Sequence, residues 1–482
     1  MTDSFSIDWE RLATEFLQRS PRLRDRKSSY QVSRPYIPTL PDTIQLRDYQ
    51  KQAIGRWLRH NGRGTLKMAT GSGKTIIALA LTVELYQKIG LQTLLVICPY
   101  RHLVTQWARE CNNFNLQPIL AFESVHNWQN QLSTQLYNLR VGNQKFVAIL
   151  TTNSTLLSEG LQSQLKFLPA KTLIVGDEAH NLGSPQLEAA LPRNLGLRLA
   201  LSATPERYYD DDGTDLLLSY FGAILKPEFT LADAIASNAL VRYLYYPIFV
   251  ELTPTESLAY AKLTKRIGWA MSENEQIGSN PILTSLLMQR SRLIGAAANK
   301  LNALDDLMQS RRHTTHTLFY CGDGTVETPG GSQRQVTAVA RLLGAKLGYR
   351  VNTYTADTPL DQREALREQF ERGELQGLVA IRCLDEGVDI PAIRHAVILA
   401  STGNPRQFIQ RRGRLLRPHL GKTQATLFDM IVLPPQLDRE TWEVERSLLR
   451  KELKRFLEFA TLAENATEAR QKLLKIQEEY GL

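Results

Sequence analysis

The chain has 482 residues, of which 43% are hydrophobic and 22% charged, and its formal net charge is +9. Because a folded domain usually takes roughly 100 to 200 residues, this length and composition predict two to four domains with buried cores. No apolar run reaches the ~18 residues that span a bilayer, and the start MTDSFSIDWE lacks the pattern of a signal peptide. We therefore expect a cytoplasmic protein with no membrane partner, and the positive charge favours a polyanionic partner.

The first half of the chain predicts a basic arm followed by an α/β domain. Residues 1–45 contain the basic stretch RSPRLRDRKSSYQVSRPY and predict an N-terminal arm that contacts nucleic acid or is simply solvated. In residues 46–228, short runs rich in β-branched residues alternate with amphipathic helical stretches, which is the pattern of a parallel sheet covered by helices. The strands expected in this domain are 63–69, 93–99, 146–152, 172–178 and 197–204.

The second half repeats the α/β pattern after a helical segment. Residues 229–310 have apolar positions at helical spacing and predict a helical connector, whereas residues 311–433 predict a second α/β domain. Its expected strands are 315–322, 351–356, 375–383, 395–401 and 423–431. Residues 434–482 are mostly charged and predict a helical C-terminal extension. The predicted fold class is α/β, with two tandem parallel-sheet domains, a helical connector and a helical C-terminal extension.

The segment MATGSGKT, residues 68–75, lies between the end of a predicted strand and the start of a predicted helix. This is the context of a phosphate-binding loop, because glycines let backbone amides approach the phosphates and the helix N-terminus adds a favourable dipole. Lys74 would reach the β- and γ-phosphates and Thr75 would bind magnesium. Met68 stands where the strict pattern has its first glycine. The residues expected to bind the nucleotide here are Thr70, Gly71, Ser72, Gly73, Lys74 and Thr75.

Two carboxylates end another predicted strand, in LIVGDEAH, residues 173–180. Burying an unpaired charge costs several kcal/mol, so a cation is expected close by. Asp177 fits a magnesium ligand, and Glu178 fits the group that orients and polarises the attacking water. A helix cap is the alternative role for either carboxylate.

These motifs and their order resemble those of superfamily 2 DEAH-box helicases. The first-domain matches are LRDYQKQAI (46–54) with the adenine-recognising segment, CPYRHLVTQW (98–107) with motif Ia, TTNSTL (151–156) with the next DNA-backbone motif and LSATP (201–205) with motif III. The second-domain matches are VAIRCLDEGVDIP (379–391) with motif V and QRRGRLLR (410–417) with motif VI. The resemblance covers about residues 45–432. It implies two RecA-like domains that bind ATP and Mg²⁺ in the cleft between them.

The resemblance also implies roles for single residues. Those placed around the nucleotide, besides the phosphate loop, are Gln50 at the adenine, Gly387 and Asp389 near the ribose, and Gln410 as a nucleotide sensor. Those placed on nucleic-acid phosphates are Arg101, Thr152 and Arg382, for which ordinary surface positions are the alternative. Those expected to couple the site to neighbouring elements are His180, Ser202 and Thr204.

A cluster of four arginines lies in IQRRGRLLRP, residues 409–418. Such crowded guanidiniums repel one another unless an anion compensates them, and a solvated basic helix end is the alternative. The resemblance identifies the anion as the γ-phosphate, with Arg414 and Arg417 as arginine fingers, which accelerate hydrolysis by ~10³ to 10⁵. It leaves Arg411 structural or facing the cleft, and Arg412 solvated.

The connector sequence YFGAILKPEFTLADAIASNALVRYLYYPIFVELTPTE, residues 220–256, resembles that of XPB-like helicases and of type III restriction enzyme motor subunits. The length of the chain is similar to that of restriction helicases associated with DNA phosphorothioation. We therefore expect a DNA-dependent ATPase, a helicase or translocase in bacterial defence, restriction or repair. Its DNA would be single-stranded or duplex with a single-stranded region. Any cleavage would be done by a nuclease or defence-complex partner in trans. The alternatives are an RNA helicase and a non-unwinding, ATP-gated DNA-binding subunit that recruits an effector nuclease.

Overall fold

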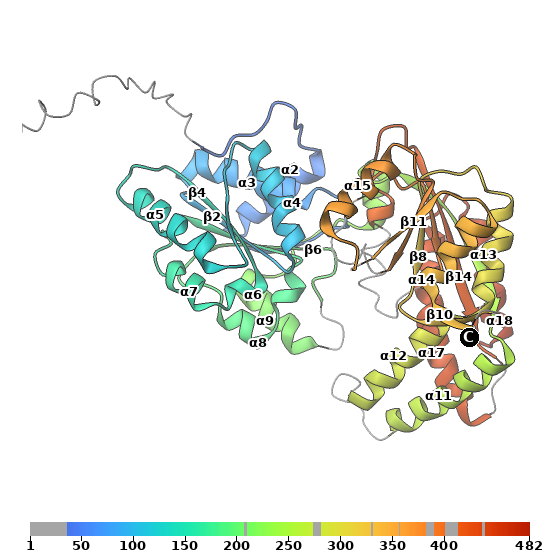
Figure 1. Cartoon of the computed structure of the whole chain (residues 1–482). Coiled ribbons are helices and arrows are strands. Elements are labelled where there is room, and N and C mark those ends of the chain that lie inside the picture. Colours follow the sequence, from blue (N-terminus) through green and yellow to red (C-terminus); the bar gives the residue numbers. More distant parts are fainter. Residues whose placement is uncertain are drawn as a thin grey trace, which may run out of the picture. The chain divides into compact units, whose positions relative to one another are not determined.

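The computed structural model describes the chain in eight stretches: residues 36–206, 210–272, 281–328, 331–355, 357–381, 390–400, 413–435 and 439–482. In these stretches the backbone forms two six-stranded parallel sheets, each with helices against both faces (Figure 1). The predicted α/β class with two tandem parallel-sheet domains is therefore confirmed. None of the helices described is long and apolar enough to cross a membrane.

The first sheet has the strand order β1-β6-β5-β2-β4-β3. Its strands are β1 (Arg63–Lys67), β2 (Thr93–Cys98), β3 (Ile119–Ala121), β4 (Val147–Thr152), β5 (Thr172–Asp177) and β6 (Leu197–Ser202). All five strands predicted for this domain are present, and the sequence did not reveal the three-residue β3. Lys67 pairs with Ser202, and Asp177 pairs with Leu201. The carboxyl ends of β1, β5 and β6 therefore lie at one edge, where α/β folds bind ligands.

Helices cover both faces of the first sheet. They are α2 (Asp48–Arg59), α3 (Lys74–Ile89), α4 (Arg101–Asn113), η2 (Val125–Asn127), α5 (Gln129–Arg140), α6 (Asn153–Leu156), α7 (Glu159–Leu165), η3 (Ala179–Leu182), α8 (Pro185–Ala189) and α9 (Asp211–Phe221). Successive strand residues point to opposite faces, so Leu94 and Val96 of β2 join the core under α2, α3 and α4. Leu95 and Ile97 join the second core, under α5, α7 and α9. Burial on both faces explains why these strands appear as continuous apolar runs.

The second sheet has the strand order β11-β12-β8-β13-β14-β7. Its strands are β7 (Arg242–Glu251), β8 (Thr317–Cys321), β11 (Val351–Tyr354), β12 (Gly377–Ile381), β13 (His395–Ile398) and β14 (Gln424–Leu433), and the antiparallel pair β9 (Thr325–Thr328) and β10 (Gly331–Arg334) lies apart from it. The helices that follow β10 in this domain are α14 (Gln335–Arg341), η5 (Leu342–Lys346) and α15 (Leu360–Glu371). All five strands predicted for the second domain are present.

The segment predicted as a helical connector contributes helices and one strand. Its helices are α10 (Leu231–Ala236), α11 (Pro254–Ser272), α12 (Pro281–Gly295) and α13 (Asn299–Gln309). Between α10 and α11, β7 pairs with β14 along its whole length and forms the edge of the second sheet. The aromatic run RYLYYPIFVE favours a strand, and buried Tyr243 and Tyr245 show its period of two. The boundaries 229 and 310 remain a prediction.

The C-terminal extension consists of α17 (Arg439–Thr461) and α18 (Ala466–Glu479). A buried ion-pair cluster joins it to the connector helices. Arg290 of α12 contacts Glu445 at 3.2 Å and Glu452 at 3.1 Å, both on α17, and donates to the hydroxyl of Tyr260 on α11 at 2.6 Å. Removing one partner of such a buried pair costs ~3–5 kcal/mol, because the other charge stays buried. The extension is therefore packed against the connector helices, and its Leu453 and Phe456 lie in the core that contains strands of the second sheet.

Candidate nucleotide-binding site

The predicted phosphate loop begins where β1 ends and finishes at the first turn of α3. Gly71 (φ +85°) and Gly73 (φ +77°) adopt the left-handed conformation that glycine takes at no steric cost. A Cβ atom at Gly73 would lie 2.6 Å from Nε2 of Gln50, whose side chain would have to move away from the loop. Gly73 caps the 16-residue helix α3, whose first amides have no partner within the helix. The sequence thus builds an anion-binding helix N-terminus at this loop.

Lys74, the first residue of α3, folds back over the loop. Its Nζ donates to the backbone oxygen of Met68 at 3.2 Å and to that of Ala69 at 3.5 Å. Burial lowers the pKa of Lys74, although the carboxylates of Glu178 and Asp177 act in the opposite direction. The ammonium group of Lys74 therefore lies within electrostatic reach of two carboxylates at the edge of the sheet.

Two hydroxyl groups of the loop lack a partner among the described residues. Thr70 Oγ1 and Ser72 Oγ are buried, and neither atom forms a hydrogen bond with another described residue. A buried polar group left unsatisfied costs about 1–3 kcal/mol, so the loop fits a ligand that is rich in hydrogen-bond acceptors. Phosphate oxygens are such acceptors. Together with the glycines and Lys74, these hydroxyls fit the phosphates of a nucleotide.

Asp177 ends β5 and is 8% exposed. Trp107 Nε1 donates to its Oδ2 at 2.8 Å, and the backbone amide of Glu178 donates to its Oδ1 at 3.0 Å. Burial and the charge of Glu178 raise the pKa of Asp177 to about 6, against the opposing effects of the Trp107 hydrogen bond and Lys74. The buried carboxylate at the end of β5 and the hydroxyl of Thr75 at the start of α3 are oxygen ligands of the kind that Mg²⁺ prefers. These two residues fit the predicted metal position.

The three residues predicted to couple the site form a chain of contacts with Glu178. His180 Nδ1 lies 3.7 Å from Glu178 Oε2 and 3.1 Å from Ser202 Oγ. Ser202 Oγ in turn accepts a hydrogen bond from the amide of Thr204 at 3.1 Å. Glu178 itself has φ +43°, a sparsely populated conformation for a residue with a side chain. The structure brings these residues together, and their coupling role stays a prediction.

Gln50 and its neighbour Tyr49, on α2, contact the phosphate loop. Gln50 is 6% exposed and its Nε2 donates to the backbone oxygen of Ser72 at 3.4 Å. The Tyr49 hydroxyl donates to the same oxygen at 2.8 Å. Tyr49 also stacks on Phe229, with ring centroids 4.0 Å apart. The predicted adenine-reading side chain therefore lies beside the loop.

The arginine segment of the second domain reaches the phosphate loop. A Cβ atom on Gly413 would lie 2.6 Å from Cβ of Thr70, so this close approach requires a glycine. Arg414 is 5% exposed, and the positive charges of Arg417 and Arg414 both contribute to the lowered pKa of Lys74. The structure thus places both predicted arginine fingers within electrostatic reach of the loop.

The predicted nucleic-acid residues differ in their surroundings. Arg101, the first residue of α4, is exposed and forms an ion pair with Glu123 at 3.2 Å. Thr152 is 3% exposed, and its hydroxyl caps α6 by accepting the amide of Thr155 at 3.2 Å. The Thr152 hydroxyl thus serves the protein itself, and contact of either residue with nucleic acid stays a prediction.

Several predicted residues lie outside the described stretches. They are Arg382, Gly387, Asp389, Gln410, Arg411 and Arg412.

Two residues that contact the site were not predicted from the sequence. Trp107 lies 70 positions before its partner Asp177, and Tyr49 lies 23 positions before Ser72. The available signal was that buried tyrosine and tryptophan need hydrogen-bond partners. That rule indicates a partner exists but not which one, because the partner depends on the sheet order.

Comparison with known families matches both domains. The model described as type III restriction enzyme, res subunit, matches residues 43–207, and the helicase conserved C-terminal domain matches residues 299–419. The DNA 3'-5' translocase XPB2 of Sulfurisphaera tokodaii is 27% identical over 395 residues, which are 79% of this chain and 80% of that protein. The chain spans a smaller share, 61%, of longer relatives such as the uncharacterized protein Rv2917 of Mycobacterium tuberculosis.

Two solved structures share the fold. The ATP-dependent type ISP restriction-modification enzyme LlaBIII bound to DNA matches with a TM-score of 0.55 and 19% identity, covering 88% of this chain and 31% of that one. The helicase domain of Pyrococcus furiosus Hef matches with a TM-score of 0.51 and 18% identity, covering 82% of this chain and 97% of that one. These similarities confirm that the two sheets are tandem RecA-like domains.

The raised pKa of Asp177 generates a pH prediction. We expect the gain in nucleotide affinity on adding Mg²⁺ to fall as the pH drops through about 6, because protonated Asp177 is a poor metal ligand. Trp107→Phe removes a hydrogen bond that favours the ionised form, so the midpoint should move up by about one pH unit. Titrating a fluorescent ADP analogue with and without Mg²⁺ from pH 5 to pH 8 measures both.

Trp57→Phe is the matched control for this experiment. Trp57 is also buried, and its indole donates one hydrogen bond, to the backbone oxygen of Arg198 and not to Asp177. The substitution removes that bond. Its midpoint should equal that of the unchanged protein. Equal midpoints for Trp107→Phe and Trp57→Phe would show that Asp177 does not control the metal-dependent affinity.

Proposed function

We propose that this chain, an ATP-hydrolysing superfamily 2 helicase resembling XPB-like helicases and type III restriction motor subunits, is a DNA-stimulated translocase or helicase. The observation that carries the proposal is the edge of the first sheet. There a glycine-shaped loop with two unsatisfied buried hydroxyls lies beside Asp177 and Glu178, and the arginine segment of the second domain contacts the same loop.

Each charged residue of the site has a proposed task in hydrolysis. Lys74 and the amides of the loop bind the phosphates of ATP in the ground state. Mg²⁺ held by Thr75 and Asp177 would neutralise phosphate charge. Glu178 orients the attacking water and accepts its proton, and His180, 3.7 Å away, holds the carboxylate in place.

Arg414 and Arg417 supply positive charge from the second domain. As arginine fingers they stabilise the charge that develops on the transferred phosphoryl group, so hydrolysis requires both domains. ATP binding then favours closure of the two domains, and hydrolysis lets them open again. Closing and opening move the nucleic-acid contacts of one domain relative to those of the other. Arg101 and Thr152 in the first domain and Arg382 in the second are the proposed phosphate contacts.

DNA is the proposed substrate because the name of the relative XPB2 describes it as acting on DNA. XPB2 is described as a DNA 3'-5' translocase, so we propose the same direction for this chain. The match of residues 43–207 to the res subunit of type III restriction enzymes supports a role in bacterial DNA defence or restriction, with a repair role next. In a defence system, a nuclease partner in trans would make the cut.

The first test of this function separates phosphate binding from chemistry. Lys74→Ala should lower ATP turnover at least ~10²-fold and weaken nucleotide binding, because it removes a ground-state phosphate contact. Glu178→Gln should lower turnover ~10²- to 10⁴-fold but leave ATP bound, because it removes only the group that acts on water. Steady-state hydrolysis and equilibrium ATP binding measure the two effects. Normal turnover in either variant would contradict the assigned site.

The second test concerns the arginines. Arg414→Ala and Arg417→Ala should each lower kcat at least ~10²-fold, with a much smaller change in ATP affinity, because the fingers act mainly in the transition state. Lysine at 417 should not restore the rate, since a point charge lacks the planar two-donor fork of arginine. Arg372→Ala is the control, because that guanidinium is 65% exposed and lies at the end of α15. Equal, mild losses at all three positions would mean that the cluster is an ordinary basic surface.

The third test identifies the substrate. ATP turnover should rise with single-stranded or forked DNA and less with RNA, and a motor that moves 3'–5' should displace a blocking protein from the 5' end of a single strand. DNA affinity should fall steeply with salt and show little sequence preference, because phosphate contacts release counterions and do not read bases. Greater stimulation by RNA would favour an RNA helicase. Stimulation by DNA without movement would favour an ATP-gated subunit that recruits a nuclease.

A further inference from the structure

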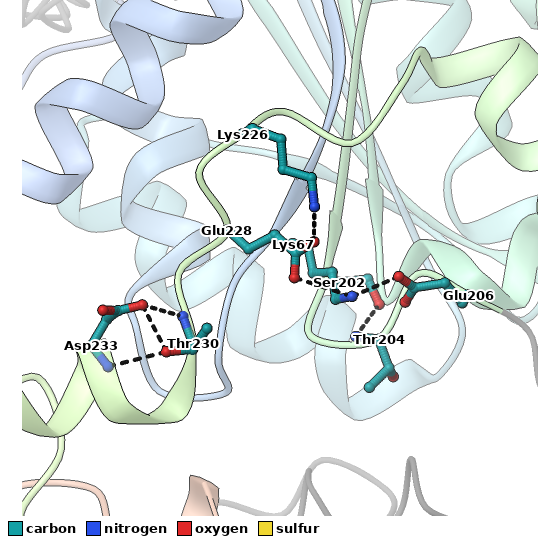
Figure 2. Close-up of polar contacts among 8 residues, drawn as sticks. All are labelled: Lys67, Ser202, Thr204, Glu206, Lys226, Glu228, Thr230 and Asp233. Carbon is teal, nitrogen blue, oxygen red and sulfur yellow. Dashed lines mark hydrogen bonds and ion pairs between the residues drawn. The ribbon is translucent and has the colours of Figure 1, made fainter.

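Lys67 forms two ion pairs that no step of hydrolysis requires. It is the last residue of β1, directly before the phosphate loop, and its Nζ lies 2.6 Å from Glu206 Oε1 and 3.2 Å from Glu228 Oε2. Figure 2 shows the ammonium group between the two carboxylates, with Lys226 on the other side of Glu228. Burial lowers the pKa of Lys67, but the two carboxylates outweigh it and raise the pKa overall.

The three residues come from three segments with different tasks. Lys67 leads into the loop that holds phosphate. Glu206 lies two positions after Thr204. Thr204 ends the coupling chain, the series of contacts that starts at Glu178. Glu228 lies in residues 222–230, between α9 and α10, where the backbone leaves the first domain; we call these residues the exit segment. The ion pairs therefore join the phosphate loop, the end of the coupling chain and the domain exit.

Backbone hydrogen bonds hold the same three segments together. The amide of Met68 donates to Ser202 O at 2.9 Å, and the amide of Ala69 donates to Phe229 O at 2.8 Å. The amide of Phe229 in turn donates to Lys67 O at 3.0 Å. The exit segment thus runs beside the end of β1 as an extra edge, while β6 lies on the other side.

The exit segment leads directly into the second domain. Thr230 and Asp233 form a reciprocal capping box that starts α10, as Figure 2 also shows. Ala234 of α10 is buried in the core that contains strands of the second sheet. Phe229, one residue before the cap, packs against the cores of both domains. Only a few residues therefore separate Glu228 from the core of the second domain.

We propose that Lys67 is a positioning residue, and that its ion pairs with Glu206 and Glu228 carry the state of the ATP site to the connector and so to the second domain. The proposed steps of hydrolysis assign none of the three side chains a contact with ATP or the attacking water. They act by keeping the exit segment in register with the phosphate loop when the coupling chain moves. The expected effect on movement along DNA rests on the proposed function, whereas the expected effect on domain closure does not.

The variant Lys67→Met tests the proposal. We expect ATP affinity to stay within about twofold of the unchanged protein, because the phosphate contacts remain. The distance moved along DNA per ATP should fall about fivefold or more, which is the lower range of a typical coupling between sites. Lys67→Arg, which keeps the charge, should restore most of it.

A second readout does not depend on DNA. Dyes at cysteines introduced at Tyr137 and Leu420, both exposed and one in each domain, report domain closure by energy transfer when a non-hydrolysable ATP analogue binds. Closure should be reduced in Lys67→Met at saturating analogue. The domains of the unchanged protein could close on the analogue although DNA does not stimulate its ATP turnover. That result would contradict the proposed function but leave the Lys67 inference standing.

Matched variants separate the junction from general charge loss. Lys226→Met removes an ammonium group that is 70% exposed and paired with Glu228, and both readouts should match the unchanged protein. Glu228→Gln should resemble Lys67→Met, and the double variant should be no worse than Lys67→Met alone, because that variant already breaks the Lys67–Glu228 pair. Wild-type closure and movement in Lys67→Met, no closure in the unchanged protein, or equal losses in Lys226→Met would each overturn the proposal.

Discussion

Two adjacent carboxylates at the end of a buried strand create the requirement around which this site is built. All six residues of β5 are buried, so Asp177 and Glu178 lie at the edge of the sheet with little water to screen them. Lys74 supplies an ammonium group, and the Trp107 indole and the Glu178 amide donate to Asp177, but the charge of Glu178 still contributes to the raised pKa of Asp177. Two adjacent carboxylates that still repel one another favour a divalent cation beside them, and a cation in turn favours phosphate. The preference for a metal–nucleotide complex thus follows from the order of the strands.

The phosphate loop is fixed from several directions. Ser202 of β6 holds its first amide, Phe229 of the exit segment holds the next, and Tyr49 of α2 holds the oxygen of Ser72. Gly413, from the second domain, approaches the loop so closely that a side chain would not fit. A charged ligand that binds to this loop therefore affects four separate segments through direct contacts. A long relay of side chains is not needed to link nucleotide binding to the domain exit.

Local signals in the sequence account for much of the fold and for part of the site. Strands buried on both faces, such as TLLVIC in β2, form apolar runs that stand out, whereas the three-residue β3 is too short to do so. The loop glycines, Lys74 and the Asp177–Glu178 pair were predictable because their chemistry depends on spacing within a few residues. The partners of Lys67 were not, since Glu206 is 139 positions away and only the pairing of β1 with β6 brings it close. Burial of Thr152 also depends on the fold, because its hydroxyl is taken by a helix cap that the sequence alone did not reveal.

The physical character of the Lys67 junction suits a part that must move. Lys67 and Glu228 are about a quarter exposed and Glu206 is half exposed, so each ion pair contributes at most about 1 kcal/mol. The stacked rings of Tyr49 and Phe229 add apolar contact that does not depend on charge. An apolar core at the same place would resist separation, and a fully buried ion pair would cost several kcal/mol to break. Weak, partly solvated ion pairs and a stacked aromatic pair together hold the three segments in register and cost little free energy to rearrange.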